Sequence, residues 1–450
     1  MSPAGALSTD LYELTMAAGY HAAGGTARGT FELFVRELPP TRGYLVAAGL
    51  EPALDFLGTW HCQEDEIAYL RSLSALQGAP DSFFDEYLPA LRFSGDVWAV
   101  PEGTPVFAGE PLLRVTAPLA EAQLVETALL ATVLFQTSVA SRAARVVDAA
   151  AGRPVTEFGG RRAHGPSAAA SAARAAVLGG CAATSNVEAG YRYGLPVAGT
   201  MAHSWVMAAP DETTAFRRYS ELFGDQAVLL IDTYDPIAAT DTIVAERLTP
   251  AAVRLDSGDL ARLSRDVRRR LDVGGLGETQ ILVSGDLDEH RVEALVAADA
   301  PIDGFGVGTA LSTSSDAPSL SGVYKLVEVE RDGVLTPLMK LSEGKRTEPG
   351  SKQVWRARDA GLAAGDVVGL SGEAGPTGAE PLLVQVMRAG ERLGPPSSVL
   401  AMRERSRAAV AELPSAVRRL TAPASYPVER SPGVRRLADR LATALAGGAG

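Results

Sequence analysis

Residues 252–286 read AVRLDSGDLARLSRDVRRRLDVGGLGETQILVSGD, and this stretch decides the fold class. Two short apolar runs, 252–255 and 280–283, flank a segment in which apolar residues recur at helical spacing. A polar turn that contains glycine and aspartate directly follows each apolar run. The stretch therefore predicts a strand, a helix and a second strand that lies parallel to the first.

The same pattern of apolar runs and polar turns continues on both sides of this stretch. Apolar runs that precede a polar or glycine-containing turn occur at 154–158, 196–199, 227–231, 252–255, 280–283 and 302–307. Amphipathic helices are predicted at 259–271 and 288–298. Strands and helices that alternate in this way indicate an α/β fold, and both a barrel and a doubly wound sheet satisfy the pattern.

Charge and composition restrict the class of function. The 450 residues carry a formal net charge of -12, so the chain is a poor candidate for sequence-independent binding of nucleic acid. The best apolar stretch, 128–140, is interrupted by threonine, glutamine and serine, so no membrane span is expected. We expect no signal peptide, because no basic segment precedes an apolar one at the N-terminus. Cys62 and Cys181 lack CxxC partners, which fits a reduced cytoplasmic protein.

Polar turns follow all six predicted strands, and in a parallel α/β protein such turns share one face, where barrel active sites are built. These turns are Gly159-Gly160-Arg161-Arg162, Gly199-Thr200-Met201-Ala202-His203-Ser204, Asp232-Thr233-Tyr234-Asp235, Asp256-Ser257-Gly258-Asp259, Gly285-Asp286 and Gly306-Val307-Gly308-Thr309. The sequence therefore predicts one site that brings together arginines, a histidine and aspartates.

Each turn also has an ordinary structural interpretation. Gly306-Val307-Gly308-Thr309 is either a tight strand-to-helix turn or a cradle whose N–H groups hold a phosphate. Arg161-Arg162 is either a solvated pair or a reader of planar anions, and its flanking glycines favour the second interpretation.

The histidine and aspartates at these turns also have both a structural and a functional interpretation. Most histidines are structural, but His203 lies just past a predicted strand end, where a neutral imidazole can act as nucleophile or base. Asp256 and Asp286 either cap the next helices, or hold ribose hydroxyls and stabilise positive charge at an anomeric carbon. Asp259 and Asp288 remain available as caps.

Eight segments, taken together and in this order, resemble the signature stretches of nicotinate phosphoribosyltransferases. They are TDLYELTM (9–16), EFGGRR (157–162), TSNV (184–187), GTMAHS (199–204), IDTYD (231–235), RLDSGD (254–259), FGVGT (305–309) and VYKLV (323–327), and they cover roughly residues 7–355.

The resemblance implies a type II phosphoribosyltransferase fold, an irregular α/β barrel joined to an open-faced α/β domain. On this basis we expect the open-faced domain at 1–118, with part of 330–395 returning to it. The catalytic barrel is expected at 119–329, and a peripheral helical tail at 396–450. The resemblance also implies a homodimer whose active sites are shared between subunits.

The resemblance further implies roles for the residues at the predicted site. Nicotinate would stack between Phe158 and Tyr12 of the other subunit, and its carboxylate would meet Arg161, Thr200 and Arg254. Gly306, Gly308 and Thr309 would hold the 5-phosphate of phosphoribosyl pyrophosphate, with Asp256 and Asp286 at the ribose and pyrophosphate. His203 would be phosphorylated by ATP and oriented by Asp232. Mg²⁺ would neutralise the pyrophosphate, held largely by substrate oxygens.

The position of Ser185 bears on the choice of base. Related nicotinamide phosphoribosyltransferases have an aspartate there, which would repel nicotinate, whereas a neutral serine tolerates the acid. Nicotinamide or quinolinate phosphoribosyltransferase remains the alternative activity, and a non-catalytic phosphosugar-binding barrel is the alternative outside enzymes.

Overall fold

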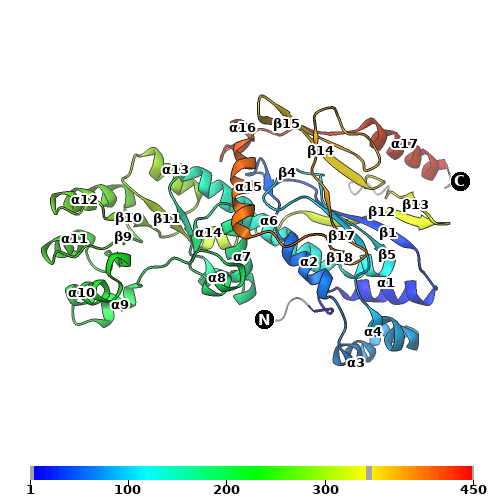
Figure 1. Cartoon of the computed structure of the whole chain (residues 1–450), viewed down its shortest axis with the longest axis horizontal. Helices are drawn as coiled ribbons and strands as arrows, with labels where there is room; N and C mark the ends of the chain where they lie inside the picture. The colour runs from blue at the N-terminus through cyan, green and yellow to red at the C-terminus, as the bar shows by residue number, and fades with distance from the viewer. Residues whose placement is uncertain (1–4, 341–346, 448–450) are drawn as a thin grey trace. The chain divides into compact units, whose positions relative to one another are not determined.

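The computed structural model of the chain (Figure 1) describes residues 5–340 and 347–447. The chain divides into two compact units. Unit 1 comprises residues 1–138, 319–397 and 408–450, and unit 2 comprises residues 139–318 and 398–407. Within the described ranges, no helix combines the length and apolarity that crossing a bilayer requires.

Unit 2 contains a parallel sheet whose strand order identifies a barrel. Its strands are β6 (Val155–Glu157), β7 (Ala183–Thr184), β8 (Val228–Leu230), β9 (Ala252–Leu255), β10 (Gln280–Val283) and β11 (Gly304–Val307). They pair in the order β7-β6-β11-β10-β9-β8, so the first strand lies between the second and the last. Val155 of β6 is in register with Phe305 of β11. A doubly wound sheet does not join its first strand to its last in this way, so the α/β prediction is confirmed in its barrel form.

The opening of this barrel lies between β7 and β8, and here one predicted strand is wrong. Residues 196–199 do not form a strand, and only Val197 makes an isolated parallel bridge, to Thr184. The strand beside β6 is instead β7, two residues long. Because Pro196 lacks an N–H and Gly199 has no side chain to pack, the apolar run could not form a full ladder.

Helices connect the strands of unit 2, and Figure 1 shows α11 and α12 beside each other outside the strands β9 and β10. The helices are α7 (Pro166–Leu178), α8 (Val187–Tyr193), α9 (His203–Ala208), α10 (Glu212–Phe223), α11 (Pro236–Ala245), α12 (Leu260–Val273), α13 (Glu289–Ala297) and α14 (Thr309–Ser312). Asp259 caps α12 through the N–H of Arg262, and Asp288 caps α13 through the N–H of Arg291. Asp256 and Asp286 are therefore not the caps of these helices.

Unit 1 is built mainly on antiparallel sheets. A seven-stranded sheet has the order β13-β12-β1-β5-β3-β17-β18, a second sheet the order β16-β14-β15-β19, and β2 pairs with β4. These strands are β1 (Arg28–Val35), β2 (Leu45–Val46), β3 (Asp96–Ala99), β4 (Pro105–Val106), β5 (Pro111–Pro118), β12 (Gly322–Arg331), β13 (Val334–Pro337), β14 (Lys352–Asp359), β15 (Leu362–Leu370), β16 (Glu380–Pro381), β17 (Val384–Arg388), β18 (Glu391–Arg392) and β19 (Val428–Arg430). Chain segments from both ends of the sequence thus share one hydrophobic core.

The remaining helices belong to unit 1 or run from one unit into the other. They are α1 (Leu11–Ala22), α2 (Leu50–Thr59), α3 (Glu64–Ser72), α4 (Leu88–Ala90), α5 (Leu119–Leu124), α6 (Glu126–Ala149), α15 (Val399–Ala411), α16 (Ser415–Arg418) and α17 (Pro432–Gly447). The C-terminal segment contributes a strand as well as helices, because β19 pairs in parallel with β15.

A buried carboxyl pair stabilises the second sheet of unit 1. Asp366 accepts hydrogen bonds from Arg356 and from the Tyr426 hydroxyl, and the Tyr426 ring stacks on Phe107 at 3.9 Å. Burial raises the pKa of Glu110 well above its usual range, and the neighbouring Asp366 raises it further. The Oε1 atom of Glu110 has no donor among the described residues, so a protonated Glu110 can donate to Asp366.

Glu110→Gln is expected to stabilise the protein more at pH 8 than at pH 5. A carboxyl group whose pKa is raised by folding binds more protons in the native state, so its contribution to stability is lost as pH rises. Glutamine copies the protonated form and does not titrate. Thermal unfolding at the two pH values measures the difference, with the exposed Glu429→Gln as control. An equal change in Tm at both pH values would contradict the assignment.

Candidate active site

Two adjoining pockets lie at the carboxyl ends of the strands in unit 2, and Phe158, Arg161 and Arg254 line both. The larger has a volume of about 520 Å³ and the smaller about 150 Å³. The larger is also lined by Gly160, Ser185, Asn186, Val187, Glu188, Gly199 and Thr200, and the smaller by Arg162, Asp256, Ser284, Gly285, Asp286, Gly306, Gly308 and Thr309. Every predicted site residue except Tyr12, His203 and Asp232 therefore lines a pocket.

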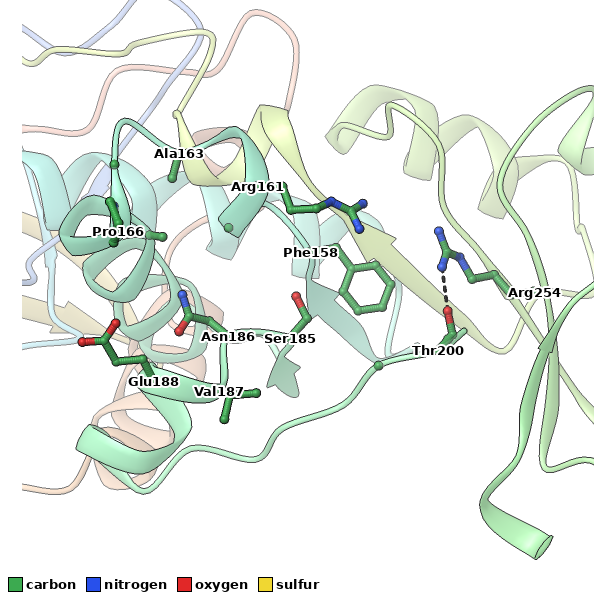
Figure 2. A pocket seen from close by; sticks show the side chains of 14 residues that line it. Phe158, Arg161, Ala163, Pro166, Ser185, Asn186, Val187, Glu188, Thr200 and Arg254 are labelled. Carbon is green, nitrogen blue, oxygen red and sulfur yellow. Dashed lines mark hydrogen bonds between the residues drawn. The ribbon is translucent and has the colours of Figure 1, made fainter. Parts of the chain in front are cut away.

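Arg254, on β9, is held in one orientation by three partners. Its Nε donates to the Ser284 hydroxyl at 2.7 Å, one terminal nitrogen to the Thr200 hydroxyl at 2.6 Å, and the other to Asp256 at 2.7 Å. A guanidinium has five N–H groups, so two remain for a ligand. Figure 2 shows the guanidinium groups of Arg254 and Arg161 pointing toward the same space beside the Phe158 ring. This arrangement can bind a planar aromatic anion.

Phe158 occupies its place because residue 306 has no side chain. A Cβ atom on Gly306 would lie 2.5 Å from two carbons of the Phe158 ring and 3.2 Å from the Cβ of Ser284. The ring also lies 5.6 Å from the Arg254 guanidinium carbon, within cation–π range. Gly306 thus provides room for the aromatic wall, in addition to lining the smaller pocket.

Gly306→Ala is expected to push the Phe158 ring aside and raise the KM for the ligand of the larger pocket several-fold. The overpacking should cost about 1–3 kcal/mol of stability, since the ring can move. Steady-state kinetics and thermal unfolding check both effects. Gly277→Ala is the control, because its Cβ would meet nothing within 4 Å. Unchanged kinetics in the Gly306 variant would exclude this role for the ring.

Asp256 stays ionised between Arg254 and His203. Burial raises the pKa of Asp256, but the hydrogen bonds from Ser284 and Arg254 and the Arg254 charge outweigh it, so the pKa lies below its ordinary value. The second carboxylate oxygen of Asp256 lies 3.9 Å from Nε2 of His203. Asp256 can therefore stabilise positive charge that develops beside it.

His203 is the first residue of α9, and its Nδ1 lies 3.2 Å from the Thr233 hydroxyl. Nearly half of its side chain is exposed, which leaves the ring open to a reactant. Asp232, predicted to orient His203, instead accepts from the N–H of Asp256 and the hydroxyl of Ser257. No ion pair joins Asp232 to His203 within the described ranges, so its predicted role stays a prediction.

The smaller pocket combines glycines with an unusual aspartate. Gly285 has a φ of 97°, and a Cβ there would lie 1.9 Å from the carbonyl oxygen of Asp256, so only glycine fits. Asp286 follows with a φ of 48°, an uncommon conformation for a residue with a side chain. Gly308 and Thr309 begin α14, where backbone N–H groups lack intrahelical partners and can meet an anion.

Ser185 and Glu188, at the edge of the larger pocket, add little charge to its interior. Ser185 is exposed and offers a neutral hydroxyl. Glu188 also lines the pocket, but it pairs with Arg192 at 2.9 Å, and in Figure 2 its carboxylate points away from Phe158. Arg161 and Arg254, which both line the pocket, therefore make its interior favourable for an anion.

Tyr12 lies on α1 in unit 1, and nearly half of it is exposed. Burial and the neighbouring Glu126 and Glu13 raise the pKa of its hydroxyl, which is therefore protonated at neutral pH. Its predicted stacking on a ligand stays a prediction.

The described residues hold no cluster of three or more metal-ligating side chains. One observation fits a cation bound partly by substrate: Oδ1 of Asp232 is buried and has no partner among the described residues. Asp256 and Asp286 provide further carboxylates nearby in the smaller pocket.

Comparisons with known proteins agree with this geometry. The nicotinate phosphoribosyltransferase family model matches residues 154–358, and the family's N-terminal and C-terminal domain models match residues 7–134 and 371–438. A nicotinate phosphoribosyltransferase of Mycobacterium tuberculosis is 45% identical over 432 residues, covering 94% of this chain and 91% of the relative. The chain belongs to the nicotinate phosphoribosyltransferase family.

Two further relatives extend the comparison within this family. The nicotinate phosphoribosyltransferase of Bacillus subtilis is 44% identical over 360 residues, covering 78% of this chain and 72% of the relative. The crystal structure of human nicotinic acid phosphoribosyltransferase superposes with a TM-score of 0.85 at 29% identity, covering 96% of this chain and 99% of the human one.

Sequence reasoning missed three polar residues that support the site. Ser284 joins Arg254 to Asp256, Thr233 contacts His203, and Glu157 accepts from Thr184 directly before the pocket residues 158 and 185. The available signal was a polar residue at the end of an apolar run, as in Ile281-Leu-Val-Ser284. A glutamate inside the apolar run 154–158 was the corresponding signal for Glu157.

Proposed function

We propose that this chain transfers the phosphoribosyl group of phosphoribosyl pyrophosphate to nicotinate, giving nicotinate mononucleotide and pyrophosphate. This reaction begins NAD salvage from nicotinate. The observation that supports it most strongly is the pinned guanidinium of Arg254, which faces an aromatic wall beside a glycine-lined pocket. A planar pyridine carboxylate suits the larger pocket, and a sugar phosphate suits the smaller one.

In the proposed reaction, the pyridine nitrogen forms a bond to C1 of the ribose while the bond from C1 to the pyrophosphate oxygen breaks. The electron pair leaves with pyrophosphate, and no proton needs to move. Positive charge develops on the sugar, and the ionised Asp256 would stabilise it. Arg161 and Arg254 would hold the nicotinate carboxylate, so that positioning accounts for much of the rate.

Mg²⁺ would be held largely by oxygens of the substrate. Single carboxylates, such as Asp232 with its unpartnered Oδ1 or Asp286 in the smaller pocket, would complete its coordination. The cation would supply positive charge that neutralises the departing pyrophosphate.

We further propose that ATP phosphorylates His203 and that hydrolysis of the phosphohistidine favours product formation. The exposed ring at the start of α9 supports this role, since a nucleophilic imidazole must be accessible. With Nδ1–H donating to the Thr233 hydroxyl, Nε2 would be the attacking nitrogen.

Ser185 favours nicotinate over nicotinamide, because no carboxylate at this position repels the acid. Quinolinate, with its second carboxylate, is the other alternative substrate.

We also propose that the protein is a cytoplasmic homodimer in which the partner contributes Tyr12 to the site.

A product assay tests the proposed function. Purified protein is incubated with Mg²⁺, phosphoribosyl pyrophosphate and nicotinate, nicotinamide or quinolinate, with and without ATP. Nicotinate mononucleotide should form from nicotinate, and faster with ATP. Turnover of nicotinamide in its place would overturn the Ser185 argument, and no turnover of any base would favour the non-catalytic alternative.

A further inference from the structure

The two walls of the larger pocket come from the ends of neighbouring strands. After β6, Phe158 and Arg161 form one wall, and after β7, Ser185, Asn186 and Val187 form the facing wall, as Figure 2 shows. The two strands are very short, and Glu157 and Thr184, their last residues, are direct partners in register. Two strands of this length hold the walls together only weakly by themselves.

A buried hydrogen-bond chain connects these walls beneath the pocket. The N–H of Gly159, in the first wall, donates to Oε1 of Glu157. The hydroxyl of Thr184 donates to Oε2 of Glu157 at 2.6 Å. The same hydroxyl accepts from the N–H of Asn186, in the second wall, at 3.0 Å. Glu157 and Thr184 are both completely buried.

The chemistry of Glu157 argues for a specific role. Burial raises the pKa of the Glu157 carboxyl, while the Thr184 hydroxyl and the Gly159 N–H lower it. No arginine, lysine or histidine lies within 4.0 Å of this carboxylate in the part of the chain that the structure describes. Burial of a carboxylate without a neighbouring cation is unfavourable unless hydrogen bonds compensate for its lost hydration, so the donors from Thr184 and Gly159 must keep their positions. Here those bonds fix the backbone of both pocket walls.

We propose that Glu157 and Thr184 are positioning residues that set the separation of the two pocket walls, and thereby the affinity for the pyridine ring. This inference rests on the proposed function. Neither residue lines a pocket, so each acts through the backbone of Gly159 and Asn186. The smaller pocket shares Phe158 and Arg161 with the first wall but no residue with the second wall. A sugar phosphate in that pocket would therefore depend less on the separation of the walls.

Thr184→Val removes the hydroxyl and keeps the shape of the side chain, whereas Thr184→Ser keeps the hydroxyl. We expect Thr184→Val to raise the KM for nicotinate about tenfold and leave the KM for phosphoribosyl pyrophosphate within about twofold. Thr184→Ser should restore most of the nicotinate affinity. If Thr184→Val does not fold, Glu157→Gln provides the same comparison, because its amide group replaces one of the two acceptors.

Thr240→Val is the matched control. Thr240 is also completely buried in unit 2, and its hydroxyl donates to the carbonyl of Pro236 at 2.7 Å, within α11. The Thr240→Val variant should have a lower Tm but an unchanged KM for nicotinate. The inference is overturned if Thr184→Val keeps the wild-type KM for nicotinate, if both substrates lose affinity equally, or if Thr184→Ser is no better. Failure of wild-type protein to use nicotinate would instead overturn the proposed function, and with it this inference.

Discussion

Arg254→Ala is expected to raise the KM for nicotinate roughly 10- to 100-fold, while the KM for ATP changes little. Charge-assisted hydrogen bonds contribute about 1.5–3 kcal/mol each, and each 1.4 kcal/mol corresponds to about tenfold in affinity. The side chain is held by Ser284, Thr200 and Asp256, so its free N–H groups need no further ordering when the substrate binds. Steady-state kinetics with each substrate varied in turn measures the effect.

Two companion variants test the cause of this loss. Arg254→Lys keeps the charge but lacks the planar fork, so it should recover only part of the affinity. Arg217→Ala removes an exposed arginine of unit 2 that pairs with Glu246, and it should behave as wild type. An unchanged nicotinate KM in Arg254→Ala would remove this residue from the substrate site.

His203→Ala should abolish ATP hydrolysis and the phosphorylated enzyme, yet leave slow product formation that ATP no longer accelerates. The imidazole is the proposed phosphoryl acceptor, whereas the pockets that would bind nicotinate and the sugar phosphate do not include it. Phosphate release, radiolabel from ATP retained on the protein, and nicotinate mononucleotide formation without ATP measure the three quantities.

His290→Ala is the control for this variant, because His290 is exposed on α13. It should retain ATP hydrolysis in full. Retained ATP hydrolysis in His203→Ala would refute the phosphohistidine, and loss of the ATP-independent reaction as well would indicate a direct part for His203 in phosphoribosyl transfer.

Local patterns in the sequence predicted the parts of the site that short-range chemistry determines. The apolar spacing of residues 260–271 located α12, and the aspartates at 259 and 288 were correctly available as caps. Because those caps were assigned, Asp256 and Asp286 were free for other roles, and both line the smaller pocket. The turns after the strands could be predicted to converge because parallel strands end at one face.

Contacts between distant residues could not be predicted in the same way. The pairing of β6 with β11 distinguishes a barrel from a doubly wound sheet. Apolar spacing predicts where each strand lies but not which strands become neighbours, so this pairing could not be predicted. Two-residue strands such as β7 have too few residues for a periodic signal, whereas the longer apolar run 196–199 resembles a strand in sequence. Ser284 and Glu157 were missed because their importance depends on partners far away in the chain, Arg254 and Thr184.

The pairing of the first barrel strand with the last also has a consequence during synthesis on the ribosome. Residue 155 leaves the exit tunnel long before residue 305, its partner, so one edge of β6 must wait for the rest of the barrel to be translated. Contacts this distant in sequence form slowly, and an unpaired strand edge can associate with other chains. The nascent protein is therefore expected to need protection by chaperones until β11 has emerged.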